Sequence, residues 1–161
     1  PGSTIGNYKP HEAKKLLKKF SEILGSNNFL IIGVDLRKEK KIMEDAYNDS
    51  KGVTAKFNIN ILKRINDDHG SFFDLDQFEH SAFFNKKEKR IEMHLVSKIK
   101  QSVKILNNKI NFEKGESIHT ENSYKYSKKE FSILSSSSGF EIKKILTDDE
   151  NFFGIFFLKV I

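Results

Sequence analysis

The stretch Phe29-Leu30-Ile31-Ile32-Gly33-Val34-Asp35-Leu36 is an almost unbroken apolar run. A run of this length predicts a strand buried on both faces, as in a parallel sheet. A helix is predicted before it, over residues 10–24, because four apolar residues share one helical face: Leu16, Leu17, Phe20 and Leu24. Gly25 follows where a helix-terminating glycine belongs. Helix, short loop and buried strand form one half-turn of an α/β winding.

The chain then leaves this winding for a mostly helical region and returns to strands. Helices are expected over 39–48 and 53–68, with Gly52 between them, Gly70 closing the second, and a short helical turn over 72–78. Strands are expected over 81–84 and 90–103, followed by a hairpin with its turn at Asn107-Asn108. A helix over 128–138, stopped by Gly139, and an antiparallel strand pair over 140–146 and 152–160 complete the chain.

A polar stretch, His119-Thr120-Glu121-Asn122-Ser123-Tyr124-Lys125-Tyr126-Ser127, precedes that last helix. It carries a carboxylate, hydroxyls, an amide and two phenols, so we expect a loop rather than a core segment. Ser127 is the expected N-cap, with Glu130 reaching back in a capping box. Polar groups ahead of a helix often form a binding rim, although an ordinary polar loop gives the same pattern.

Composition limits the class of protein. The 161 residues are 37% hydrophobic with 15 Phe, enough for one compact domain with a core. Cysteine is absent, which excludes disulfides and Cys-based zinc sites and favours a reducing compartment, the cytoplasm. No apolar run approaches the ~20 residues that span a bilayer. The net charge of +6 comes from lysines mixed with acids, so we expect no nucleic acid and no membrane as partners.

The chain opens with Pro1-Gly2-Ser3-Thr4-Ile5-Gly6-Asn7, without an initiator methionine. Its two glycines would let a ligand approach the backbone closely, although the Gly-Lys-Ser/Thr end of a phosphate loop is missing. The opening suggests a piece of a longer protein. The missing N-terminal half, or a second copy of this chain, is therefore an expected partner.

Six blocks in order are more specific than any single motif: residues 1–7, 33–36 (Gly-Val-Asp-Leu), 46–49 (Ala-Tyr-Asn-Asp), 52–58 (Gly-Val-Thr-Ala-Lys-Phe-Asn), 91–97 (Ile-Glu-Met-His-Leu-Val-Ser) and 119–126. Together they resemble the histidine-specific Nα-methyltransferases of ergothioneine biosynthesis and the related methyltransferase module of ovothiol-type enzymes. The resemblance runs through the whole chain and covers about the C-terminal half of a family member.

The resemblance implies an α/β fold: the C-terminal part of a class I (Rossmann-like) methyltransferase sheet that ends in an antiparallel hairpin, with an α+β substrate-binding insertion. Residues 1–36 would be a partial methyltransferase core, 37–126 the insertion, and 127–161 the C-terminal helix and hairpin. It also implies methyl transfer from S-adenosylmethionine to the α-amino group of L-histidine, giving hercynine. Most of the S-adenosylmethionine site would lie upstream, with only Gly2 beside it here.

By the family pattern, Asn7 and Tyr47 would hold the α-amino and α-carboxylate end of histidine. Glu121 and Ser123 would hold the imidazole, since a carboxylate accepts a ring N–H and a hydroxyl serves either tautomer. Met93 would line the ring pocket. No catalytic acid, base or metal is expected, because in-line methyl transfer depends mainly on positioning.

Two alternatives remain at this point. Glu92-x-His94 and His119-x-Glu121 could meet as a two-histidine, two-carboxylate metal cluster. The basic charge could instead mark a nucleic-acid-binding α/β module without methyltransferase activity. Even within the family, these 161 residues alone could be inactive.

Overall fold

The computed structural model describes residues 2–161; Pro1, the first residue of the opening block, lies outside the described residues. The chain forms two compact units. The first contains the chain up to Glu39, Asn85–Arg90 and Asn122–Ile161, and the second contains Lys40–Phe84 and Ile91–Glu121. The sequence-based boundaries of the insertion were 37 and 126. The short segment 85–90, which belongs to the first unit, has no signal in the sequence.

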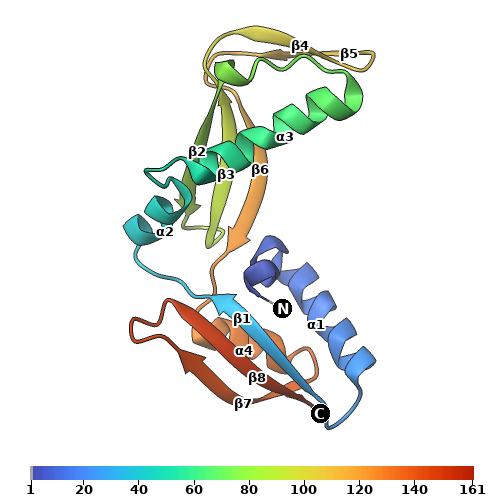
Figure 1. The fold of residues 1–161 in the computed structure, drawn as a ribbon. Helices are drawn as coiled ribbons and strands as arrows, with labels where there is room; N and C mark the ends of the chain where they lie inside the picture. The colour runs from blue at the N-terminus through green and yellow to red at the C-terminus, as the bar shows by residue number, and fades with distance from the viewer. Residues whose placement is uncertain (1) are drawn as a thin grey trace. The chain divides into compact units, whose positions relative to one another are not determined.

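The first unit is a three-stranded sheet with helices against it (Figure 1). Its elements are η1 (Ser3–Asn7), α1 (Pro10–Leu24), β1 (Phe29–Asp35), α4 (Lys128–Ser136), β7 (Phe140–Thr147) and β8 (Phe153–Val160). The strand order is β1-β8-β7, and β8 runs antiparallel to both neighbours. The predicted helix 10–24 and the predicted antiparallel pair at the end of the chain are therefore confirmed.

Strand β1 is buried on one face and largely exposed on the other, so the prediction of a strand buried on both faces was wrong. Ile32 and Val34 are fully buried in a core that α1 and α4 complete, through Leu17 and Phe131. On the other face Phe29 and Ile31 are 59% and 54% exposed. The neighbour of β1 is the antiparallel β8, not a parallel strand. On the second face Gly33 is buried beside the ring of Phe153, whereas Phe29 and Ile31 stay exposed.

The second unit combines a sheet, a hairpin and two helices. Its elements are α2 (Lys40–Tyr47), α3 (Val53–His69), η2 (Leu75–Gln77), β2 (Phe78–Asn85), β3 (Arg90–Ser97), β4 (Gln101–Ile105), β5 (Asn108–Phe112) and β6 (Ser117–Tyr124). Helix α3 lies across the sheet β2-β3-β6 (Figure 1), and Leu62 packs there in one core cluster with Leu95 and Phe78. Within residues 2–161, no helix is long and apolar enough to span a membrane.

Two details of the predicted strands were wrong. The single strand expected over 90–103 is β3 and β4, separated by a bend at which the Ser97 hydroxyl donates to the carbonyl of Ile99. The hairpin turn lies at Leu106-Asn107, one residue earlier than expected, because Ile105 pairs with Asn108. Leu106 takes the positive φ of 52°, a conformation that asparagine adopts more easily than leucine.

The polar stretch 119–127 was expected to be a loop, but most of it is a strand. Residues 117–124 form the strand β6, which pairs with β3 at one edge of the sheet. The capping box after it is confirmed: Ser127 Oγ accepts from the backbone N–H of Glu130, and the Glu130 carboxylate accepts from the backbone N–H of Ser127. Regular strand structure therefore fixes the side on which each polar group of this stretch lies.

Candidate functional site

Strand β6 passes from the second unit into the first after Glu121, and within the first unit η1 lies directly against its last residues, Ser123 and Tyr124. A side chain on Gly6 would place its Cβ 2.9 Å from the carbonyl oxygen of Tyr124 and 3.5 Å from Ser123 Oγ, so only glycine permits this approach. Asn7 follows at once and is exposed. Gly2 is also exposed, and a Cβ there would meet nothing within 4 Å. The structure thus brings Asn7 to the same part of the unit as Ser123.

Lys125 contacts a candidate site residue, and the sequence interpretation did not single it out. Its side chain is only 1% exposed, and its ammonium donates to Ser123 Oγ at 2.8 Å and pairs with the Asp35 carboxylate at 2.5 Å. The spacing Ser123-x-Lys125 was the available signal, because residues two apart on a strand share a side. A buried cation on the hydroxyl oxygen fixes the position of Ser123 and polarises its O–H bond.

In the second unit, Tyr47 and Met93 belong to one cluster. Met93 is buried at 2% exposure together with Met43 and Ile91, and the half-buried Tyr47 packs against this group. Tyr47 is the last residue of α2. The structure therefore brings these two predicted residues together, on the sheet face that the helices cover.

Glu121 lies on the other face of the same sheet. The rings of His94 and His119 stack with centroids 4.5 Å apart, so these two side chains share a face. Strand alternation places Glu121 with His119, and Met93 on the opposite side from His94. Of the predicted residues, the structure groups Tyr47 with Met93, and it places Glu121 beside the two histidines.

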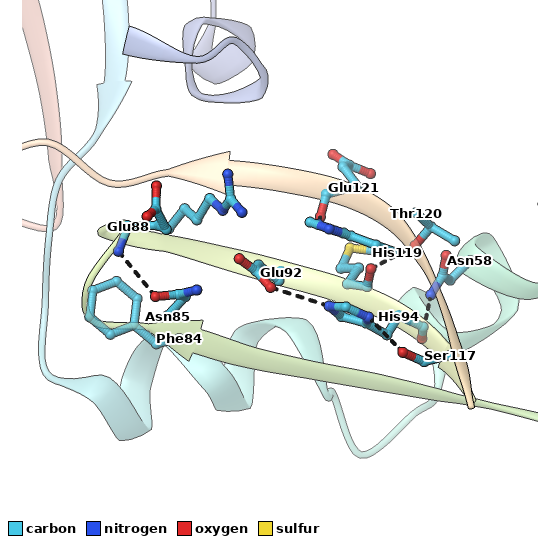
Figure 2. Close-up of polar contacts among 12 residues, drawn as sticks. Asn58, Phe84, Asn85, Glu88, Glu92, His94, Ser117, His119, Thr120 and Glu121 are labelled. Carbon is cyan, nitrogen blue, oxygen red and sulfur yellow. Dashed lines mark hydrogen bonds and ion pairs between the residues drawn. The ribbon is translucent and has the colours of Figure 1, made fainter. Parts of the chain in front are cut away.

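The alternative metal cluster can be tested on geometry. Ligand atoms of Glu92, His94 and His119 lie within 4.8 Å of one another, and Figure 2 shows Glu92 and Ser117 contacting opposite nitrogens of His94. However, the two imidazoles are stacked at an interplanar angle of 15°. A metal ion lies in the plane of its imidazole ligand at about 2.1 Å, so two nearly parallel stacked rings cannot both bind it. This arrangement is an aromatic stack, which Phe83 extends.

A cavity of about 340 Å³ in the first unit has Lys125, the partner of Ser123, in its wall but none of the predicted ligand contacts. Its walls include Pro10 and Leu134, and its charged residues include Arg37 and Glu130. Burial raises the pKa of Tyr126, which also lines it, to about 12. None of the predicted ligand contacts lines this cavity, so we assign it no part in substrate binding.

The ion pairs at this cavity make stability depend on pH. Burial opposes ionisation of Glu130, but hydrogen bonds from Lys89 and Ser127 and the charge of Arg37 outweigh it and lower the pKa from 4.5 to about 2. A lowered folded-state pKa stabilises the fold above about pH 4.5, and this contribution is lost as pH falls through about 2. The free energy of unfolding should therefore decline as the pH falls from about 4.5 to about 2.

Glu130→Gln is expected to flatten this decline by about 1 kcal/mol, because solvent screens a partly exposed ion pair. Glutamine keeps the capping box, so helix α4 should be retained. Urea unfolding followed by circular dichroism between pH 5 and about 2 measures the difference. Parallel curves for wild type and variant would show that Glu130 carries none of the acid sensitivity.

Comparison with known proteins places this geometry in context. The family model described as "Histidine-specific methyltransferase, SAM-dependent" matches residues 1–160. A histidine N-alpha-methyltransferase of Mycolicibacterium smegmatis is 40% identical over 127 residues, 78% of this chain and 40% of that protein. One of Mycobacterium tuberculosis is 35% identical over 156 residues, 96% of this chain and 49% of that protein. The chain thus spans half or less of these relatives.

Solved structures support the fold. An S-adenosylmethionine-dependent methyltransferase from Clostridium acetobutylicum matches 98% of this chain with 55% of its own, at a TM-score of 0.51 and 10% identity. The PH0226 protein from Pyrococcus horikoshii matches 99% of this chain with 52% of its own, at a TM-score of 0.52 and 9% identity. At such identities the likeness concerns the fold alone.

Proposed function

Because this chain belongs to the S-adenosylmethionine-dependent, histidine-specific methyltransferase family, we propose that the protein methylates the α-amino group of L-histidine, giving hercynine. The relatives named above are histidine N-alpha-methyltransferases, and a further one, 29% identical, is the ergothioneine biosynthesis protein 1 of Neurospora crassa. The cytoplasm is the proposed location, since a cysteine-free chain needs no oxidising compartment.

The observation that carries this proposal is the polar end of β6. Glu121 and Ser123 are two apart on one strand, and buried Lys125 holds the Ser123 hydroxyl. In the proposed complex the Glu121 carboxylate accepts one imidazole N–H, and the hydroxyl of Ser123 serves the other nitrogen. Such a pair selects imidazole strongly, because a side chain without matching groups leaves buried polar atoms unpaired.

The other end of histidine is assigned to Asn7 and Tyr47. The exposed amide of Asn7, at the end of η1, offers both donor and acceptor, and the phenol of Tyr47, at the end of α2, offers a donor to a carboxylate. Met93 contributes the buried apolar packing on which Tyr47 rests. On the family resemblance, Asn7 and Tyr47 are each proposed as a contact of histidine.

The chemistry requires little beyond positioning. S-adenosylmethionine supplies an electrophilic methyl group on a sulfonium, and the exposure of Gly2 is compatible with a ligand beside it. The amine of histidine, once it has lost its proton to water, must be held with its lone pair toward that methyl. Correct placement can contribute about 7–11 kcal/mol to lowering the barrier, which explains why no acid or base is required of this chain.

The uncovered face of the first unit points to a further part of the protein. Phe29, Ile31 and Ile155 form an exposed apolar surface on the sheet. The relatives are at least twice as long as the part that this chain matches. We assign this surface to the rest of the protein, with a second copy of the chain as the alternative occupant, and we place most of the S-adenosylmethionine site in that rest.

Calorimetry tests the function. Histidine is titrated, with and without S-adenosylhomocysteine, into these 161 residues and into a longer version of the protein that includes the upstream half. We expect the longer protein to bind histidine more tightly when S-adenosylhomocysteine is present, and the 161 residues to bind at least tenfold more weakly. The proposal would be refuted if the longer protein did not bind histidine, or if it bound glutamine and lysine as tightly as histidine.

A further inference from the structure

His80, on strand β2, is joined through both ring nitrogens to other elements of the second unit. Its Nε2 lies 2.7 Å from the carbonyl oxygen of Tyr47, and its Nδ1 lies 2.9 Å from the side-chain nitrogen of Asn58. A carbonyl oxygen only accepts, so Nε2 must carry the proton. The Nδ1 of the neutral ring can then accept from the Asn58 amide. The neighbours of His80 thus select one tautomer.

Asn58, fully buried on α3, continues this chain of hydrogen bonds at its other end. Its side-chain nitrogen also donates to the backbone carbonyl of His94 at 3.1 Å, a bond that Figure 2 shows. Because that carbonyl can only accept, the amide cannot be turned around without losing the bond. The chain of hydrogen bonds therefore begins and ends at backbone carbonyls, those of His94 and Tyr47. Only a neutral His80 that is protonated on Nε2 can make all of these hydrogen bonds.

Hydrogen bonds join the C-terminal end of α2 to strand β2. Tyr47 is the last residue of this helix, and its carbonyl accepts from Nε2 of His80. The adjacent Asn48 side chain exchanges two hydrogen bonds with the backbone of Ala82, at 2.9 and 3.1 Å. Asp49 then caps α3: hydrogen bonds from the backbone N–H groups of Thr54 and Val53 lower its pKa to about 2.

We propose that His80 is a positioning residue for substrate recognition. As the neutral Nε2–H tautomer it holds the backbone of Tyr47 on β2, so that the phenol is already in place when histidine arrives. A side chain fixed in advance need not be ordered on binding, which improves affinity without a new contact. This inference rests on the proposed function, because it takes Tyr47 as a contact of histidine.

Two matched variants test whether the hydrogen bond from residue 80 to Tyr47 matters, or whether any polar side chain at position 80 is enough. In His80→Gln the amide nitrogen can occupy the place of Nε2 and still donate to Tyr47. In His80→Asn the shorter amide can keep the contact with Asn58 but cannot reach Tyr47. In a version of the protein that methylates histidine, we expect His80→Asn to lower histidine affinity about tenfold, or about 1.4 kcal/mol. His80→Gln should stay within about threefold of wild type. His69→Ala, an exposed histidine at the end of α3, is the control and should change nothing.

S-adenosylhomocysteine affinity and the melting temperature, measured on the same variants, give the second readout. The proposal predicts that both stay close to wild type in His80→Gln, and that S-adenosylhomocysteine affinity does so in His80→Asn as well. Equal losses of histidine affinity in the two variants, or a matching loss of S-adenosylhomocysteine affinity, would overturn it.

The tautomer is tested separately from histidine binding. A long-range ¹H–¹⁵N correlation spectrum of the 161-residue chain at neutral pH should show His80 protonated on Nε2 alone. Protonation on Nδ1, or on both nitrogens, would overturn the inference even if histidine binds. Failure of the wild-type protein to bind histidine would instead refute the proposed function. The spectrum would still show whether the chain of hydrogen bonds through His80 exists.

Discussion

Replacing Glu121 by alanine is expected to lower the affinity for L-histidine by about 100-fold while leaving S-adenosylhomocysteine binding within about twofold. The variant removes the carboxylate proposed to accept the imidazole N–H, and a hydrogen bond to a charged group contributes about 1.5–3 kcal/mol. A loss of about 2.7 kcal/mol corresponds to the 100-fold change. Competition calorimetry in a version of the protein that methylates histidine measures both affinities.

Two further variants sharpen this test. Glu121→Gln keeps an acceptor of the same size without the charge, so about a tenfold loss is expected. Glu79→Ala removes an exposed carboxylate from the neighbouring part of the same unit and should have no effect. If Glu121→Ala weakens S-adenosylhomocysteine as much as histidine, the residue supports the fold and the imidazole assignment fails.

Replacing Lys125 by methionine is expected to lower the free energy of unfolding by about 3 kcal/mol. Lys125 is almost completely buried, and it neutralises Asp35, whose side chain is only 20% exposed. Removing one member of a buried ion pair costs about 3–5 kcal/mol, because the other charge stays buried without its partner. Asp35 also pairs with Lys38, so we expect the lower end of this range.

A double-variant cycle tests the origin of this loss. Asp35→Asn combined with Lys125→Met should be less destabilising than the sum of the two single variants, because the double variant leaves neither member of the Lys125–Asp35 pair buried without the other. Lys143→Met, which removes an exposed partner of Glu141, should change stability by less than about 0.5 kcal/mol. Urea unfolding followed by circular dichroism gives these values. Additive single losses would show that Lys125 and Asp35 do not act as a pair.

Much of the fold could be predicted from the sequence where neighbouring residues decide the structure. Helix α1 begins at Pro10 and ends before Gly25, as its apolar spacing and terminal residues indicated. The capping box of Ser127 and Glu130 likewise depends on residues three apart. The family assignment also came from the sequence, because six local blocks carry it in order.

The errors concern features that distant residues decide. Which face of β1 is buried depends on α1, α4 and the antiparallel β8, and the apolar run alone contains no such information. The polar stretch was taken for a loop, but pairing with β3 makes it a strand. The candidate residues Met93 and Glu121 were expected around one imidazole, and strand alternation places them on opposite faces of the sheet.

The sequence by itself determined the family, the helices and the terminal hairpin of this protein, since patterns of a few adjacent residues encode them. Only the tertiary structure decided which polar groups support the candidate site. Lys125 meets Asp35 across 90 positions of the chain, and His80 meets Tyr47 across 33. A hydrogen bond between such residues exists only after both segments have packed, so no local pattern could have predicted it.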